Sequence, residues 1–170
     1  MADYIADYST VNTSAAPLPG REGKAYAAAI QDSIPANATI KFGRGFQRKA
    51  GVGEALAVGD IAAINTAQAF RVAMYSTNAS DLDNANYSQY DMITAGKSGY
   101  YVVEVEETVT IADAVRVRLV NHASDPVKLI GKFGKTADED KTALIKGAHW
   151  VSANIVFLPD SIELILDNLT

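Results

Sequence analysis

The chain has 170 residues, of which 48% are hydrophobic, and this suits one domain whose core needs neither a metal nor a disulfide. It carries 15 Lys and Arg against 20 Asp and Glu, a formal net charge of −5, and this balance excludes binding to free nucleic acid through phosphate neutralisation. The absence of cysteine excludes disulfides and thiolate sites.

Residues 1–33 are predicted to form an extended arm. The sequence PLPG at residues 17–20 opposes regular structure, and the segment has few large aliphatic side chains and no alternation typical of a strand. No Lys or Arg precedes Arg21, and no apolar run has the length of a signal peptide or of a membrane span. We therefore expect neither secretion nor membrane binding. We also expect the arm to need a partner surface.

Residues 34–170 are predicted to form a β domain. Val115, Val117 and Leu119 alternate with arginines and predict a half-buried strand, and similar alternation predicts strands over residues 101–106 and 162–167. Shorter strands are predicted over residues 39–48, 60–64, 69–76, 129–133 and 150–157. The stretch 138–145 is the one candidate helix of this region.

Turn signals separate the predicted strands at Gly59-Asp60, at residues 96–99 (GKSG) and at Asp125-Pro126. Many short strands at close spacing, with no long helical period, predict an all-β fold. We expect a compact β-barrel or a jelly-roll-like sandwich, with the arm extending from it.

Two glycine-containing patterns resemble nucleotide-binding motifs. Gly134-Lys135-Thr136 resembles the end of a P-loop, but Leu129 stands where the first glycine should be, and the acids at residues 138–140 would repel phosphate. The glycines at 43, 45, 51 and 53 lack the third glycine of a dinucleotide fingerprint. We predict a charged surface loop in the first case and bulges or tight turns in the second.

Acidic and histidine residues give no convincing catalytic or metal site. Asp81, Asp83, Asn84 and Asp91 fail the EF-hand pattern, so we predict a solvated loop, and the spacing of the two histidines, His122 and His149, does not suggest zinc. Glu104, Glu106 and Glu107 are predicted to lie on a strand, where two of them share one solvent-facing face, and no nucleophile elbow is present. We expect no enzyme activity, no cofactor and no metal.

A basic cluster places Lys41, Arg44, Arg48 and Lys49 within nine residues that contain no acid. Residues 1–50 hold six basic and four acidic residues, a net charge of +2, whereas residues 51–170 hold nine basic and sixteen acidic residues, a net charge of −7. Two interpretations remain open: a strand that faces an acidic protein surface, or a solubilising face or lysine-guarded edge strand.

The order of several short motifs resembles that of phage structural cement (capsid decoration) proteins, over nearly the whole chain. The motifs are PLPGREG at residues 17–23, IKFGRG at 40–45, GD at 59–60, AFRVAM at 69–74, GYYVVEV at 99–105, GKFG at 131–134 and GAHWV at 147–151.

This resemblance implies a non-enzymatic virion protein that is made in the host cytoplasm and sits on the outer capsid surface. Its partners would be the major capsid protein and other copies of itself, in a homodimer or homotrimer. The arm would reach across neighbouring capsid subunits with Tyr4, Ile5, Tyr8, Val11, Pro17, Leu18, Pro19, Gly20, Arg21 and Tyr26.

Two other classes of function remain. An adhesive module on the head surface, lectin-like or fibre-like, would bind host glycan through exposed aromatic rings, and Tyr87, Tyr90, Tyr100 and Tyr101 could supply them. An enzyme on a small β-barrel ranks third. It stays open because the residues of a catalytic triad need not be adjacent in sequence.

Overall fold

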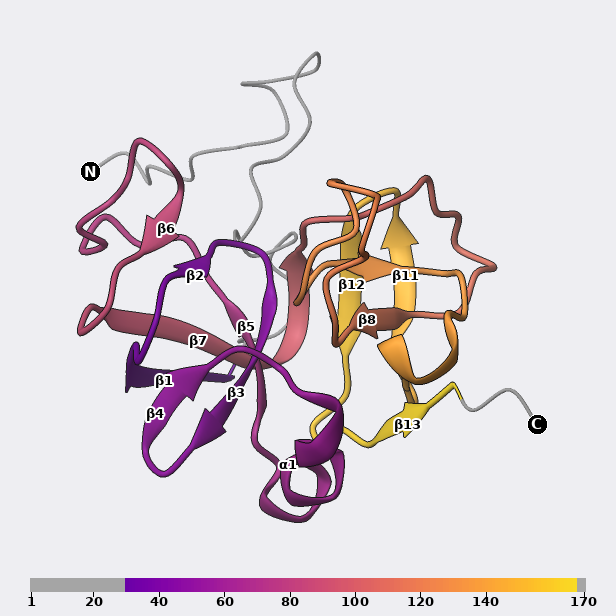
Figure 1. Ribbon diagram of the computed structural model, residues 1–170, viewed down its shortest axis with the longest axis horizontal. Helices are drawn as coiled ribbons and strands as arrows, with labels where there is room; N and C mark the ends of the chain where they lie inside the picture. The colour runs from indigo at the N-terminus through magenta and orange to yellow at the C-terminus, as the bar shows by residue number, and fades with distance from the viewer. Residues whose placement is uncertain (1–29, 168–170) are drawn as a thin grey trace, which may run out of the picture.

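The computed structural model describes residues 30–167, which form a mostly β structure with one short α-helix (Figure 1). Within them, no helix has the length and hydropathy needed to cross a membrane. The elements in chain order are β1 (Ile30–Pro35), β2 (Ile40–Lys41), β3 (Gly45–Lys49), β4 (Val52–Glu54), the 3-10 helix η1 (Val58–Asp60), α1 (Ile61–Ala67), β5 (Phe70–Ala73), β6 (Asn86–Tyr87), β7 (Met92–Val102), β8 (Arg116–Arg118), β9 (Phe133–Gly134), the 3-10 helix η2 (Glu139–Lys141), β10 (Thr142–Ile145), β11 (His149–Ser152), β12 (Ile155–Leu158) and β13 (Leu164–Leu166).

The strands form three antiparallel sheets. The largest has seven strands in the order β11-β12-β7-β5-β3-β4, with β1 also paired to β7. The second has the order β13-β10-β8-β9, and β2 and β6 make a small ribbon. The mostly β prediction is confirmed.

The long strand β7 joins the two halves of the molecule. Its first part, Met92–Ser98, pairs with β1, and its last four residues pair with β12. The turn predicted at residues 96–99 is therefore wrong. A Cβ atom on Gly96 would lie 2.5 Å from a ring atom of Tyr101, so this glycine makes room for an aromatic ring inside a strand rather than a turn.

A small core lies inside the curled end of the seven-stranded sheet. Ile34, Phe46, Tyr87 and Ile93 are almost completely buried in it. The end of β1 returns to β4 through a single bridge from Ala36 to Gly53, but β4 and β11 remain the ends of the strand order. The sheets of the described residues therefore do not close, and the expected barrel is wrong. The jelly-roll-like arrangement stays a prediction.

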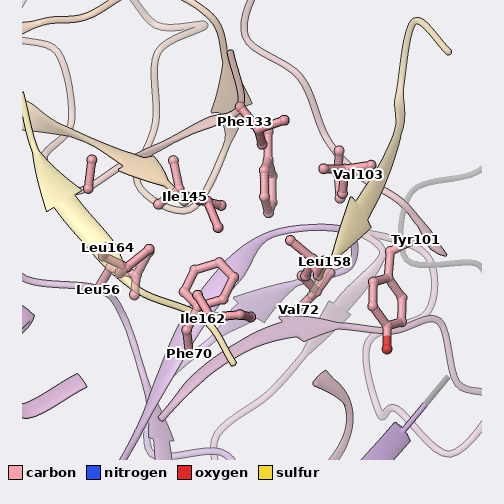
Figure 2. Close-up of a cluster of buried hydrophobic side chains, with 14 of the residues drawn as sticks. Leu56, Phe70, Val72, Tyr101, Val103, Phe133, Ile145, Leu158, Ile162 and Leu164 are labelled. Atoms are coloured by element: carbon pink, nitrogen blue, oxygen red, sulfur yellow. The ribbon is translucent and has the colours of Figure 1, made fainter. Parts of the chain in front are cut away.

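The larger core lies between the seven-stranded and four-stranded sheets (Figure 2). Phe70 on β5 and Phe133 on β9 meet edge to face, with ring centroids 6.4 Å apart. Leu158 and Ile145 bury their side chains beside them. Each such side chain contributes about 1.5–3 kcal/mol by leaving water, so this two-layer packing stabilises the fold.

The helix α1 occupies a stretch where a strand was predicted over residues 60–64. Ile61 and Ile64 are three residues apart and are both buried, which places them on one face of a helix, and the alanines between and after them favour helix. The predicted strand is wrong because two apolar residues at this spacing suit a helical face better than an alternating one.

The predicted helix over residues 138–145 is also wrong. Its first part is the 3-10 helix η2, and its second part is β10, in which Ala143 and Ile145 are buried. Since these residues alternate with the half-buried Leu144, the stretch has the period of a strand.

The other predicted strands fit to different extents. Alternation located β8 and β13 correctly, but in the third alternating stretch, residues 101–106, only the first two residues belong to a named strand, β7. Among the shorter predictions, the stretch 69–76 contains β5, and the stretch 39–48 contains β2 and most of β3. The stretch 150–157 holds most of a hairpin of two strands, and in the stretch 129–133 only Phe133 is in a strand. Gly43 and Gly51, at φ +76° and +87°, lie in tight turns as predicted.

The boundary between arm and domain remains a prediction. Strand β1 begins at Ile30, so residues 30–33, which we expected in the arm, lie in the sheet with β7. Residues 1–29 lie outside the described part of the chain.

Candidate functional site

The basic cluster is divided between paired and unpaired side chains. Arg44 follows β2, and its Nε donates to Glu104 Oε2 at 2.6 Å. Lys49, the last residue of β3, has its Nζ 2.9 Å from Asp60 Oδ2. Glu104 lies 60 residues from Arg44 and Asp60 lies 11 residues from Lys49, so the local sequence pattern does not indicate either pair. Two of the four residues of the basic cluster therefore form ion pairs within the β domain.

The other two members, Lys41 and Arg48, have no acidic partner among residues 30–167. Arg48 is exposed and Lys41 is half-buried. Arg48 lies on β3, which pairs with β4 on one side and β5 on the other. Arg48 is therefore not on an edge strand, whereas Lys41 lies on β2, which pairs with β6 alone. Both interpretations of the cluster stay open.

Two hollows lie beside the basic cluster. One, of about 180 Å³, is lined by Lys41 and Arg44 together with Thr39, Asn121 and Ile130. The second, of about 190 Å³, is lined by Arg48, Lys49, Asp60 and residues of α1. Both are below the roughly 300 Å³ of the smallest common ligand pockets. They can receive single side chains of a partner, but not a substrate or cofactor of ordinary size.

Three glutamates after β7 form an acidic connector, residues 104–107. Glu104 contacts both Arg44 and Lys132, whose Nζ lies 3.0 Å from Glu104 Oε1. Burial alone would raise the pKa of Glu104, but these two cations outweigh it and lower the pKa below its ordinary value of 4.5. The glutamate thereby joins the turn after β2 to the loop before β9.

Glu106 of the acidic connector is buried against Arg118 on β8. Arg118 Nε donates to Glu106 Oε2 at 2.5 Å, and its Nη1 donates to Asp138 at 2.9 Å. Both Arg118 and Glu106 have side chains less than 3% exposed. The prediction that these glutamates face solvent from a strand is wrong, because β7 ends at Val102 and the connector turns inward.

Glu107 binds the loop that resembled a P-loop. Its carboxylate accepts hydrogen bonds from the backbone N–H groups of Lys135 and Thr136 and from the Thr136 hydroxyl, all at 2.7 Å. Burial tends to raise the pKa of Glu107, and these bonds hold it below its ordinary value. A carboxylate of the same chain thus satisfies these N–H groups, and the loop is partly exposed, as predicted for a charged surface loop.

The aspartates of the segment after β5 organise turns. Asp81 accepts from the side chains of Asn84 and Asn86, and these bonds lower its pKa. Asp83 is exposed. In residues 30–167 no group of three or more His, Asp or Glu side chains is placed to hold a metal.

The two histidines lie in different surroundings. His122 Nδ1 accepts from the backbone N–H groups of Ser124 and Asp125 in a turn. The ring of His149 packs against Phe157, with centroids 4.9 Å apart.

Two of the four tyrosines considered for glycan binding are buried. Tyr87 and Tyr101 are fully buried, and the Tyr87 hydroxyl donates to Met74 O at 2.7 Å. Tyr100 packs on Phe157, with ring centroids 5.1 Å apart, and Tyr90 is 79% exposed. An aromatic glycan platform made of all four rings therefore does not exist.

The predicted contact residues of the arm, from Tyr4 to Tyr26, lie outside the described residues. A family model described as "Structural cement protein (E217 gp24/Pam3 gp6)" matches residues 8–161, which include most of the arm and nearly all of the β structure. The chain belongs to the phage structural cement protein family.

Membership of the cement family gives the protein a capsid-stabilising structural role in the virion and no enzymatic activity. The expectation drawn from the order of the motifs is confirmed at this level. No match to an individual curated protein was found.

Proposed function

We propose that this cement protein binds the outer surface of the head shell as a homodimer or homotrimer, with the arm and the basic cluster in contact with the major capsid protein. The family match carries the proposal, because it runs through the arm from Tyr8 as well as through the β domain. A cement protein that binds the assembled shell better than its free subunits stabilises the shell by mass action.

Unpaired positive charge supports a contact between the basic cluster and an acidic surface. Lys41 and Arg48 have no acidic partner in the described residues, and each lines a hollow of side-chain size. Carboxylates of a capsid subunit that enter these hollows would meet the two cations. Opposite charge at such a rim accelerates encounter and fixes orientation.

An oligomer would strengthen these contacts. When one copy is bound, the next binding event of the same oligomer is intramolecular, so weak contacts add to a large apparent affinity. Small hollows and a few charges per copy are therefore sufficient for stable decoration.

The test reverses the two unpaired charges. The variant Lys41→Glu/Arg48→Glu should bind heads that lack the cement protein roughly tenfold more weakly, and its binding should depend less on salt. Occupancy is measured by co-sedimentation with heads at low and high salt.

Lys97→Glu/Lys128→Glu is the matched control, because it makes the same change in net charge at two lysines, on β7 and between β8 and β9, that also lack an ion pair within residues 30–167. It should bind like the wild type. Equal binding by the two variants would show that only net charge matters and that the basic cluster is no contact surface.

A further inference from the structure

A turn before β7 holds an aromatic residue in an unfavourable backbone conformation. Asp91 N–H donates to Ser88 O at 3.1 Å, which makes Tyr90 the third residue of a four-residue turn, with φ +74°. This position of a type II turn normally takes Gly or Asn, because a Cβ atom crowds the backbone there. A bulky residue at positive φ costs conformational free energy, and such strain gathers at functional sites.

The Tyr90 turn, residues 88–91, is held rigidly. The Asp91 carboxylate accepts from the N–H and hydroxyl of Ser80 and from the N–H of Ser88, at 2.8–2.9 Å. These bonds, with the Ser80 backbone first, lower the pKa of Asp91. Tyr90 N–H donates to Ala36 O, and Ala36 N–H donates to Asp91 O, both at 2.8 Å. The turn is thereby fixed to the end of β1.

Two exposed apolar side chains lie at this rigid turn. The Tyr90 side chain is 79% exposed, and the next apolar residue, Met92, is 50% exposed. Met92 lies opposite Pro35 in the register of β1 and β7. The turn directly precedes β7, whose first residues lie at the left edge of the molecule in Figure 1. An exposed tyrosine on an ordered backbone is typical of the anchor residues of interfaces.

The charge near the turn indicates the chemistry of its partner. Residues 74–96 contain three aspartates and no Lys or Arg. Asp83 among them is exposed and has no ion pair within residues 30–167. A complementary surface is apolar at its centre and basic at its border. A symmetric contact with a second copy would instead place the aspartates of two turns against each other.

We propose that the Tyr90 turn is a preformed anchor that inserts the Tyr90 ring into an apolar, basic-bordered pocket of the capsid surface. This proposal rests on the proposed function. It adds a second capsid contact, made by a segment of the chain other than the basic cluster. Because the backbone of the turn is already held by hydrogen bonds, binding need not order it.

The test uses substitutions that suit the backbone of the turn. Tyr90→Gly removes the ring and relieves the positive φ, so its melting temperature should equal or exceed that of the wild type. Its affinity for heads lacking the cement protein should fall about tenfold or more, as for an interface anchor. Tyr90→Asn also tolerates positive φ and should behave likewise, whereas Tyr90→Phe should bind within about twofold of the wild type.

Ile111→Ala is the matched control, because Ile111 is 72% exposed on the segment between β7 and β8. It should leave binding unchanged. Decoration by Tyr90→Gly at wild-type affinity would overturn the anchor and leave the proposed function standing. A wild-type protein that does not bind heads would overturn both. Loss of binding together with dissociation of the oligomer in sedimentation velocity would assign the turn to contacts between copies and overturn the capsid partner.

Discussion

Gly131 and Gly45 bring the loop before β9 against β3. Gly45 N–H donates to Gly131 O at 2.7 Å. A Cβ atom on Gly131 would lie 2.5 Å from the backbone oxygen of Gly45, and its φ of +82° already disfavours any other residue. A Cβ atom on Gly45 would lie 2.9 Å from the ring of Phe70. A Cβ atom on Gly131 would thus meet backbone, so no side-chain rotation could relieve the clash at that position.

We predict graded losses of stability when glycines are replaced by alanine. Gly131→Ala combines a backbone clash with positive φ and should lower the free energy of unfolding by about 2–5 kcal/mol. Gly51→Ala has open space but φ +87°, and should cost about 1–2 kcal/mol. Gly59→Ala has neither problem and should be neutral or stabilise by up to about 1 kcal/mol.

Urea denaturation of the three glycine variants measures this order. A stability of Gly131→Ala equal to that of Gly59→Ala would contradict the close contact with Gly45. The sequence does not predict this order: it places Gly59 in a turn, Gly51 in a bulge or tight turn and Gly131 in a short strand, and it gives no sign of the close contact with Gly45.

At the scale of elements, β1 is tied into the β structure by an ion pair and by apolar packing. Asp32 on β1 accepts from Nε and Nη2 of Arg71, at 2.9 and 2.8 Å, and Arg71 is almost completely buried. Ile34 lies in the smaller core. The strand thus contributes a partner for a buried cation as well as apolar burial.

Truncation should separate the arm from β1. Deleting residues 1–29 should leave the melting temperature nearly unchanged and strongly reduce occupancy on heads, if the arm contacts the capsid as proposed. Deleting residues 1–33 also removes Asp32 and should lower the free energy of unfolding by about 3 kcal/mol or more, because a buried Arg71 then lacks its carboxylate.

Thermal melting of both truncated proteins, with head binding of the shorter deletion, checks this prediction. Full decoration after deletion of residues 1–29 would exclude the arm as an anchor. Equal melting of the two proteins would show that β1 does not stabilise the domain.

Alternation located strands from their apolar residues but did not show which of the intervening side chains are exposed. Val115, Val117 and Leu119 located β8 correctly, yet the intervening Arg118 is as buried as they are. The pairing of Arg118 with Glu106 depends on a chain reversal that no local pattern encodes. The basic cluster was also predicted from local sequence, because its four basic residues lie close together in the chain. Their division into paired and unpaired side chains depends on distant acids.

Over the whole molecule, bound carboxylates make stability depend on pH. Glu104, Glu107, Asp60, Asp91 and Asp138 all have pKa values below their ordinary values of 4.5 for Glu and 3.8 for Asp. A depressed pKa in the folded state adds stability above the ordinary pKa, and this stability is lost as the pH falls through the folded value. The protein should therefore keep its stability near neutral pH and lose it progressively below these ordinary values.

Chemical denaturation across this pH range measures the acid loss. Glu104→Gln should be less stable at pH 7 and should lose less stability on acidification, because its contribution is already absent. Glu139→Gln is the control, since Glu139 is exposed in η2, and it should follow the wild type. A wild-type stability that stays flat down to pH 3 would contradict the role of the bound carboxylates.

The continuity of β7 has a mechanical consequence. Ile93 on this strand packs in the smaller core and Tyr101 in the larger one, so one uninterrupted backbone is clamped at both ends. A force that pulls the two halves apart along β7 shears the ladder to β1 and the ladder to β12, so the hydrogen bonds within each ladder bear the load together rather than opening one after another. We therefore expect β7 to transmit tension between the two halves of the molecule with little extension.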